Sequence, residues 1–257
     1  MVFMNIDSAM VLCAGLGTRI RQVSADIPKP MIEVMGKSLI ERTLEFACDG
    51  GISNFVINLH YKAEILKEHI KALPIAAKIN IEFIYESILL ETGGGTKNAL
   101  SHFGSVPFFT FNSDQIWLTK AVDIMERMRK SWGDKKMQSL LLLAKKELAV
   151  GYFGRGDFEL NEEGLLLREF ANSDKTYPYI YTGLQLTSAD FFENSPDGPF
   201  SFLYLFKQAE IDGVLKNIYG IMYDDHWADV GTPEGLQQAK LYLERNDTIL
   251  VKDPFVD

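Results

Sequence analysis

The feature that constrains the fold most is an alternation of short apolar runs with helical patterns over roughly the first 145 residues. Strand-like apolar runs occur at Ala9–Ala14, Phe55–Leu59, Ile79–Tyr85, Pro107–Phe111 and Leu140–Ala144. Helical patterns lie between them, at Ser38–Cys48, at Ile65, Leu66, His69, Ile70 and Leu73 before Pro74, at Thr96–Phe103 and at Ala121–Lys130. Such alternation predicts an α/β fold, in which parallel strands are joined by right-handed crossovers and helices cover both sheet faces.

The remainder of the chain is richer in strands. The segment Asn161–Gly164 predicts a hairpin turn between Tyr152–Leu160 and Leu165–Phe170. A strand, a helix and another strand are expected in turn at Tyr179–Leu186, Phe200–Asp212 and Asn217–Tyr223. The final helix is expected to begin at Thr232 as N-cap, with Pro233 in the first helical position. Since we find no repeat or interdomain linker, we predict a single domain over residues 1–257.

Charge and composition exclude several classes of protein. There are 26 basic and 35 acidic residues, and the resulting net charge of −9 argues against sequence-independent nucleic-acid binding. The N-terminus has no secretion signal, and no apolar stretch is long enough to span a membrane. Cys13 and Cys48 suggest neither a disulfide framework nor a zinc site, and Cys13 reads as a buried apolar residue. We therefore expect a cytoplasmic protein without a membrane partner.

The most informative segment is Gly15–Arg19, followed by a lysine between two prolines at Pro28–Pro30. Glycines after a strand let backbone N–H groups approach phosphate oxygens closely. The segment is not a dinucleotide-binding fingerprint, because Ile20 stands where the third glycine belongs, and no P-loop Gly-Lys-Ser/Thr follows. Taken alone, the glycines could equally form a tight connection between a strand and a loop.

The two halves of this segment together resemble the N-terminal signature of the sugar-1-phosphate nucleotidyltransferases. The resemblance implies a Rossmann-like fold with a mixed, mostly parallel sheet. It also implies that the loop residues hold a nucleoside triphosphate, namely Ala14, Gly15, Gly17 and Thr18. By the same resemblance, Arg19 contacts the leaving phosphates and Lys29 neutralises charge at the reacting phosphorus. Cations over developing charge suit phosphoryl transfer, which needs little covalent chemistry from the protein.

Two aspartates resemble the metal ligands of the same family. Asp114 follows an apolar run in Asn112–Asp114, and Asp229 lies in Trp227–Pro233, before the last helix. One or two carboxylates together with substrate phosphates are the usual ligands of Mg²⁺. The resemblance therefore implies a Mg²⁺ ion held by Asp114 and Asp229. The alternative for either aspartate is a turn or capping role, which is common at strand ends.

Further motifs resemble a subgroup that contains N-acetylmuramate 1-phosphate uridylyltransferases and short mannose-1-phosphate guanylyltransferase-like proteins. They are Glu91–Gly95, Gly156–Phe158, Tyr181–Gly183 and Trp227–Pro233. By analogy, the base would contact Glu86, Gly93 and Gly94, and the sugar would contact Asn112, Gly156, Thr182 and Gly183. The chain departs from many relatives in lacking a central Glu-Lys pair whose lysine binds the sugar phosphate. Arg168 and Lys175 are the nearest cations.

These observations give an enzymatic hypothesis and two competitors. The preferred reaction joins UTP to N-acetylmuramate 1-phosphate, as in peptidoglycan recycling, and the alternative joins GTP to mannose 1-phosphate or a heptose 1-phosphate. Residues of about 1–145 would bind the nucleotide, and those of about 146–257 the sugar and the second metal aspartate. A non-catalytic sugar-nucleotide sensor is a different class, and a dinucleotide-dependent oxidoreductase is disfavoured by Ile20. Monomer and weak dimer both stay open.

Overall fold

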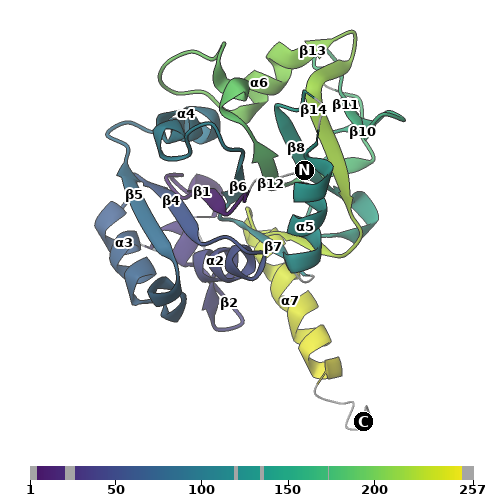
Figure 1. The fold of residues 1–257 in the computed structure, drawn as a ribbon. Coiled ribbons are helices and arrows are strands. Elements are labelled where there is room, and N and C mark those ends of the chain that lie inside the picture. The colour runs from purple at the N-terminus through teal and green to yellow at the C-terminus, as the bar shows by residue number, and fades with distance from the viewer. Residues whose placement is uncertain (1–4, 21–26, 119–120, 134–135, 173, 251–257) are drawn as a thin grey trace.

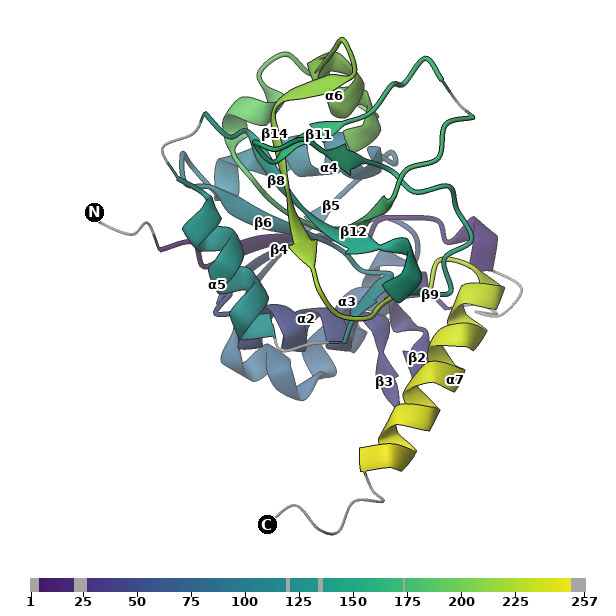
Figure 2. The same ribbon diagram turned by 90° about the vertical axis from the view of Figure 1, so that its right-hand side faces the viewer.

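A ten-stranded sheet forms the centre of the molecule in the computed structural model, which describes residues 5–20, 27–118, 121–133, 136–172 and 174–250 (Figures 1 and 2). The strand order is β10-β11-β14-β8-β12-β6-β1-β4-β5, and β13 pairs with β14 at the side. Its strands are β1 (Ser8–Leu12), β4 (Asn54–Leu59), β5 (Asn80–Tyr85), β6 (Phe108–Asn112), β8 (Ser139–Lys145), β10 (Glu159–Leu160), β11 (Leu165–Leu167), β12 (Tyr179–Thr187), β13 (Glu210–Ile211) and β14 (Val214–Tyr223). The sheet therefore draws strands from both halves of the sequence.

Strands β6, β1, β4 and β5 pair in parallel and form the half that was predicted from the alternating pattern. Successive residues of β1 point to opposite faces, so that Ala9 and Val11 lie in one apolar cluster and Met10 in the other. Helices α2 (Leu39–Asp49), α3 (Ala63–Ala72) and α5 (Ala121–Ser131) contribute to the first cluster. Helix α6 (Phe202–Ala209) and the segment after α4 (Glu91–Asn98) contribute to the second. Helices thus flank both faces of a mixed sheet, and the expected fold class is confirmed.

The second half of the sheet mixes strand directions. Strand β12 runs antiparallel to both β6 and β8, whereas β14 runs parallel to β8. The pairing of β12 with β8 shifts register between Tyr181 and Gln185, where Gly183 has a φ of 79°. The hairpin turn predicted at Asn161–Gly164 connects β10 and β11, and the Asn161 side chain accepts hydrogen bonds from two backbone N–H groups of that turn.

A small second sheet, absent from the sequence-based prediction, joins distant parts of the chain. It has the order β7 (Gln115–Trp117), β15 (Trp227–Asp229) and β9 (Ala149–Val150). Helix α7 (Pro233–Leu250) follows β15 and projects from the body (Figure 2). Its start matches the prediction, because the Thr232 hydroxyl accepts the Gly235 N–H at 3.0 Å.

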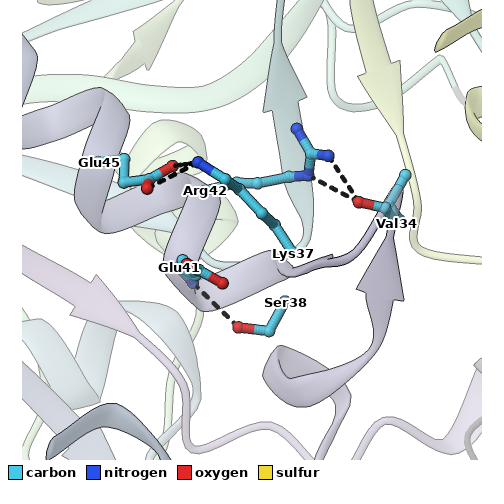
Figure 3. Close-up of polar contacts among 6 residues, drawn as sticks. All are labelled: Val34, Lys37, Ser38, Glu41, Arg42 and Glu45. Atoms are coloured by element: carbon cyan, nitrogen blue, oxygen red, sulfur yellow. Dashed lines mark hydrogen bonds and ion pairs between the residues drawn. The ribbon is translucent and has the colours of Figure 1, made fainter. Parts of the chain in front are cut away.

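A hairpin of β2 (Glu33–Val34) and β3 (Lys37–Ser38) leads into α2 and holds the chain that precedes it. Figure 3 shows Arg42 of α2 donating two hydrogen bonds to the Val34 carbonyl and Lys37 contacting Glu45. The Ser38 hydroxyl caps α2 by accepting the Glu41 N–H at 3.3 Å. These contacts anchor the β2–β3 hairpin against α2.

Several boundary predictions were wrong. The helix expected at Thr96–Phe103 begins at Glu91 instead, so the three glycines at 93–95 are helical and do not form a loop before the helix. Close packing accounts for glycine in this helix despite its low helix propensity: a Cβ would collide with Phe200 at Gly93, with Gly198 at Gly94 and with Glu86 at Gly95. Ile65 is 50% exposed, since α3 buries only the narrow stripe of Leu66 and Ile70.

Two strand and helix ends also differ from the prediction. Within residues 152–158, all of which the structure describes, there is no strand apart from an isolated bridge at Phe158, and the pairing segment is limited to β10. Helix α6 spans only Phe202–Ala209, because Glu210 and Ile211 pair with β14 as strand β13. The backbone hydrogen bonds of this end are thus made with a strand rather than within the helix.

Candidate active site

The glycine loop follows β1 at the carboxyl end of the parallel strands, where ligands bind in open α/β sheets. Gly17 has a φ of 61°, and a Cβ there would lie 3.1 Å from the Lys29 Cβ. Glycine therefore allows both the turn and the close approach of the lysine segment. After it, Thr18–Ile20 form a short 3-10 helix in which Ile20 is buried while Thr18 and Arg19 stay exposed. The buried isoleucine anchors the turn and leaves its polar neighbours available for a ligand.

Lys29 projects from a second 3-10 helix and reaches Asp114. Pro28 is extended, with φ and ψ of −56° and 139°, and Pro30 is buried, so the backbone on both sides of the lysine is restricted. The Lys29 ammonium lies 2.5 Å from Asp114 Oδ2, and the two side chains are only 13% and 23% exposed. The predicted catalytic cation and the predicted metal ligand thus contact each other directly.

The two predicted metal aspartates lie side by side. Strands β7 and β15 pair antiparallel with Asp229 opposite Gln115, and the Val230 N–H donates to the Asp114 carbonyl at 3.3 Å. Burial raises the pKa of Asp229, and the charge of Asp114 raises it further. Burial also opposes ionisation of Asp114, but the Lys29 charge and hydrogen bonds from Lys29 and Gln115 outweigh it and lower the pKa of that carboxyl. The site therefore holds two neighbouring acidic groups, with Lys29 and Arg19 as the nearby compensating cations.

Gly231 lies at the centre of the charged groups. A Cβ on this glycine would lie 2.9 Å from Asp229 Oδ1, 3.6 Å from the Lys29 ammonium and 3.8 Å from an Arg19 nitrogen. The Gly231 N–H also donates to Asp229 Oδ1 at 2.9 Å. Arg19, Lys29 and Asp229 consequently surround Gly231, and Asp114 joins them through its ion pair with Lys29, although the four residues come from separate segments.

A pocket opens beside this cluster. Its walls come from the carboxyl ends of β1, β4 and β6, the glycine loop, the start of α4 and the start of α6. The lining residues are Leu12, Cys13, Ala14, Gly15, Gly17, Thr18, Arg19, Lys29, Pro30, Asn58, Leu89, Glu91, Thr92, Asn112, Ser113, Asp114, Ser201 and Gly231. The structure therefore gathers the predicted triphosphate loop, both predicted catalytic cations, Asn112 and Asp114 in one place.

The three residues expected to contact the base lie outside this lining. The Glu86 carboxylate is buried and accepts hydrogen bonds from Asn58 and from the Leu90 N–H. A Cβ on Gly93 would collide with the Phe200 ring at 2.5 Å, and the Gly94 N–H donates to the Phe200 carbonyl at 2.8 Å. The glycines thus face a neighbouring segment of protein, which is the packing role that glycines in a close contact usually have.

Only one of the four residues expected to contact the sugar lines the pocket. Thr182 is fully buried, its hydroxyl donates to the Leu142 carbonyl, and its carbonyl accepts the Trp227 indole N–H. Gly183 lies against Asn112, since a Cβ there would be 2.9 Å from the Asn112 amide nitrogen. The Gly156 N–H donates to the Tyr152 hydroxyl. Of this group only Asn112 lines the pocket, and Gly183 borders it through Asn112.

The two cations considered as acceptor-phosphate ligands are engaged elsewhere. Arg168 donates to the Asp157 carbonyl at 2.8 Å and lies over the rings of Phe158, Phe170 and Tyr177. Lys175 pairs with Glu169 at 2.9 Å. Among the described residues of this part of the fold, the lysine that many relatives use therefore has no evident replacement.

Several pocket residues were not among the site residues predicted from the sequence, and four of them are uncharged polar residues, namely Asn58, Thr92, Ser113 and Ser201. Asn58 is 2% exposed and is the only polar residue in the predicted run Phe55–Leu59. A lone amide within such a run was a usable signal, because buried polar side chains need specific partners. Ser113 and Thr92 lie within the motifs Asn112–Asp114 and Glu91–Gly95 but were given no role there, and Ser201 carried no signal of its own.

The fold and this arrangement define a nucleotidyltransferase. A family model described as nucleotidyl transferase matches residues 8–246, and the chain belongs to that family. The chain is 35% identical over 240 residues to N-acetylmuramate alpha-1-phosphate uridylyltransferase of Caulobacter vibrioides, an alignment covering 92% of this chain and 95% of the relative. It is 28% identical over 228 residues to D-glycero-alpha-D-manno-heptose 1-phosphate guanylyltransferase of Campylobacter jejuni, covering 88% and 95%. The resemblance stated from the motifs is confirmed.

Solved structures agree on the fold. HddC from Yersinia pseudotuberculosis, solved in complex with GMP-PN, superimposes with a TM-score of 0.73 at 24% identity, covering 93% of this chain and 100% of that one. A UDP-glucose pyrophosphorylase complexed with UDP-glucose gives a TM-score of 0.73 at 18% identity, covering 94% and 99%. Across the described residues, none of the helices has the length and apolar character that crossing a membrane requires.

Proposed function

We propose that this protein transfers a nucleotidyl group from a nucleoside triphosphate to a sugar 1-phosphate. The observation that carries the proposal is the convergence of Arg19, Lys29, Asp114 and Asp229 around Gly231, beside a glycine-lined pocket. A non-catalytic sensor would have no need for all four charges at one point. Ile20 is buried in an apolar cluster, so a glycine-dependent dinucleotide turn is not formed there.

In this reaction an anionic oxygen of the sugar 1-phosphate attacks the α-phosphorus of the triphosphate. The new bond joins that oxygen to the α-phosphorus, while the bond from the α-phosphorus to the bridging β-oxygen breaks and pyrophosphate leaves. Arg19 and Lys29 place positive charge beside the phosphates, which favours the transition state over the substrates as charge develops. Because the attacking oxygen is already anionic, no general base is required.

The residues present fit a Mg²⁺ ion. Asp114 and Asp229 supply two carboxylates side by side. No cluster of three or more His, Cys, Asp or Glu suited to a metal is found in the described part of the chain, so further ligands would be phosphate oxygens and water. Mg²⁺ commonly takes one or two carboxylates together with substrate phosphates. Held there, the ion would add positive charge next to the triphosphate.

For the substrates, we propose UTP with N-acetylmuramate 1-phosphate, supported by 35% identity over 92% of the chain to a relative of that name. GTP with a heptose or mannose 1-phosphate is the second candidate, supported by the 28% identical heptose 1-phosphate guanylyltransferase. Cytoplasmic location and a place in peptidoglycan recycling belong to this proposal. The free state of both cysteines is compatible with a reducing compartment.

The test is incubation with each triphosphate, Mg²⁺ and each sugar 1-phosphate, followed by detection of pyrophosphate and of the sugar nucleotide. We expect turnover with UTP and N-acetylmuramate 1-phosphate. We expect Asp114→Asn to abolish turnover in a folded protein, whereas Asp224→Asn at an exposed ion pair should keep it. Absence of pyrophosphate with every pair, or normal rates for Asp114→Asn, would refute the proposal.

A further inference from the structure

A buried polar bridge lies behind the pocket, between the glycine loop and the start of α4. Asn58 Oδ1 accepts the Cys13 N–H at 2.8 Å, and Asn58 Nδ2 donates to Glu86 Oε1 at 2.7 Å. The other Glu86 oxygen accepts the Leu90 N–H at 2.9 Å. Asn58 and Glu86 are 2% and 6% exposed, so water does not compete strongly for these bonds.

The bridge has a fixed chemical polarity. A backbone N–H such as that of Cys13 can only donate, and an ionised carboxylate can only accept. Asn58 therefore has one arrangement that satisfies both neighbours, with its oxygen toward Cys13 and its NH₂ toward Glu86. Glu86 must in turn accept from both sides, because the Leu90 N–H is also a donor. Neither Asn58→Asp alone nor Glu86→Gln alone preserves all three bonds.

The absence of a side chain at Gly95 leaves room for the bridge. A Cβ on Gly95 would lie 2.7 Å from Glu86 Oε1 and 2.8 Å from Asn58 Nδ2, so it would press against both partners of this hydrogen bond. The third glycine of the 93–95 run thus serves this contact, whereas the first two face residues 198–200. Both ends of the bridge attach to pocket walls, since Cys13 leads into the glycine loop and Leu90 into Glu91.

We propose that Glu86 is a positioning residue that acts through Asn58 to set the start of the triphosphate loop and, through Leu90, the opposite wall of the pocket. This inference rests on the proposed function, because the bound triphosphate lies between those walls. It assigns Glu86 a role inside the protein in place of direct contact with a base. Displacing either wall moves the groups that line the pocket and is expected to weaken triphosphate binding; in reaction rate, a misplacement of one ångström costs about 100-fold.

The test exchanges the amide and the carboxylate of the bridge between the two positions. It compares Asn58→Asp, Glu86→Gln and the double variant that carries both substitutions. In the double variant the carboxylate introduced by Asn58→Asp would accept from both the Cys13 N–H and the NH₂ introduced by Glu86→Gln. The amide oxygen introduced by Glu86→Gln would accept from Leu90, so all three bonds return. Asn54→Asp is the matched control, because Asn54 begins the same strand at its far, exposed end. UTP and GTP binding is measured by calorimetry with Mg²⁺, together with KM for UTP and for the sugar 1-phosphate.

We expect each single variant to weaken triphosphate binding about 10-fold or more, with the sugar-phosphate KM nearly unchanged, and the double variant to recover most of it. All measurements are made well below the lowest unfolding temperature of the variants. If Asn58→Asp does not fold, the comparison of Glu86→Gln with the double variant still tests the inference. Hydrogen exchange in a peptide spanning Cys13 should quicken in the singles and slow again in the double. Normal binding in the singles, or no recovery in the double, would overturn the inference. Hydrogen exchange reports on the bridge even if the protein turns over no pair of triphosphate and sugar 1-phosphate. A failure of this inference can therefore be told apart from a failure of the proposed function.

Discussion

Replacing Gly231 by alanine tests whether the charged groups must stay where the structure places them. The new Cβ would lie 2.9 Å from Asp229 Oδ1, whereas ordinary contact begins near 3.4 Å. The difference, 3.4 minus 2.9, requires the carboxylate to shift by 0.5 Å. If one ångström of misplacement costs about 100-fold in rate, half an ångström costs about 10-fold, or about 1.4 kcal/mol of activation free energy.

Stability should respond differently from rate. Gly231 does not have a positive φ, so alanine is compatible with the backbone, and its lower unfolded-state entropy contributes about 0.4–1 kcal/mol in the opposite direction. We expect the kcat/KM from pyrophosphate release to fall about 10-fold while the unfolding temperature changes by only a few degrees. Gly133→Ala is the control, because a Cβ there meets nothing within 4 Å. Unchanged kinetics in Gly231→Ala would show that Asp229 needs no such placement.

Three further predictions follow from the pocket. Gly15→Ala should raise the stability by about 0.4–1 kcal/mol, because Gly15 has no positive φ and a Cβ there meets no protein atom within 4 Å. It should raise the KM for the triphosphate several-fold, because Gly15 belongs to the pocket wall; an unaltered KM in steady-state assays would contradict this. In Lys29→Met, Asp114 loses its ion-pair partner and Arg19 is left as the neighbouring cation. Mg²⁺ alone at about ten times its Kd should then stabilise this variant by about 1.4 kcal/mol in thermal unfolding and the wild type much less; equal responses would count against the Lys29–Asp114 ion pair as a competitor of Mg²⁺. Burial raises the pKa of Cys13 to about 12, so its thiol stays protonated at about pH 8. Treatment of the folded protein with iodoacetamide at that pH should therefore leave Cys13 unlabelled, as measured by peptide mass spectrometry; rapid labelling would refute its burial.

Much of the site could be predicted because its signals are local. The glycine loop, Arg19 and Lys29 lie within one short stretch, and Gly17 is required there by its own φ and by the approach of Lys29. The start of α7 was also predictable, since capping depends on adjacent residues such as Thr232. Local physical rules act over a few residues, so a sequence displays them directly.

The surroundings of Glu86, Gly93 and Gly94 were harder to predict. Glu86 was expected to contact the base, and this stays a prediction; what the sequence did not indicate is that each of its carboxylate oxygens accepts a hydrogen bond within the protein, from Asn58 and from the Leu90 N–H. The hydrogen bond from the Cys13 N–H to Asn58 joins residues 45 positions apart, and no pattern in the sequence predicts it. Gly93 and Gly94 joined α4 because of their contact with Phe200 and Gly198, a segment about a hundred residues later. Tertiary packing decided these roles against the local propensity of glycine.

By itself the sequence determined the alternating elements and the chemistry of the loops between them, because hydrophobic periodicity and turn residues act locally. Only the tertiary structure decided which loops meet. Asp114 and Asp229 are 115 positions apart, 229 minus 114, and become neighbours because β7 and β15 pair in a small sheet that no periodicity indicated. Strand order follows from the packing of the whole chain, so the charge cluster around Gly231 exists only once that packing is complete.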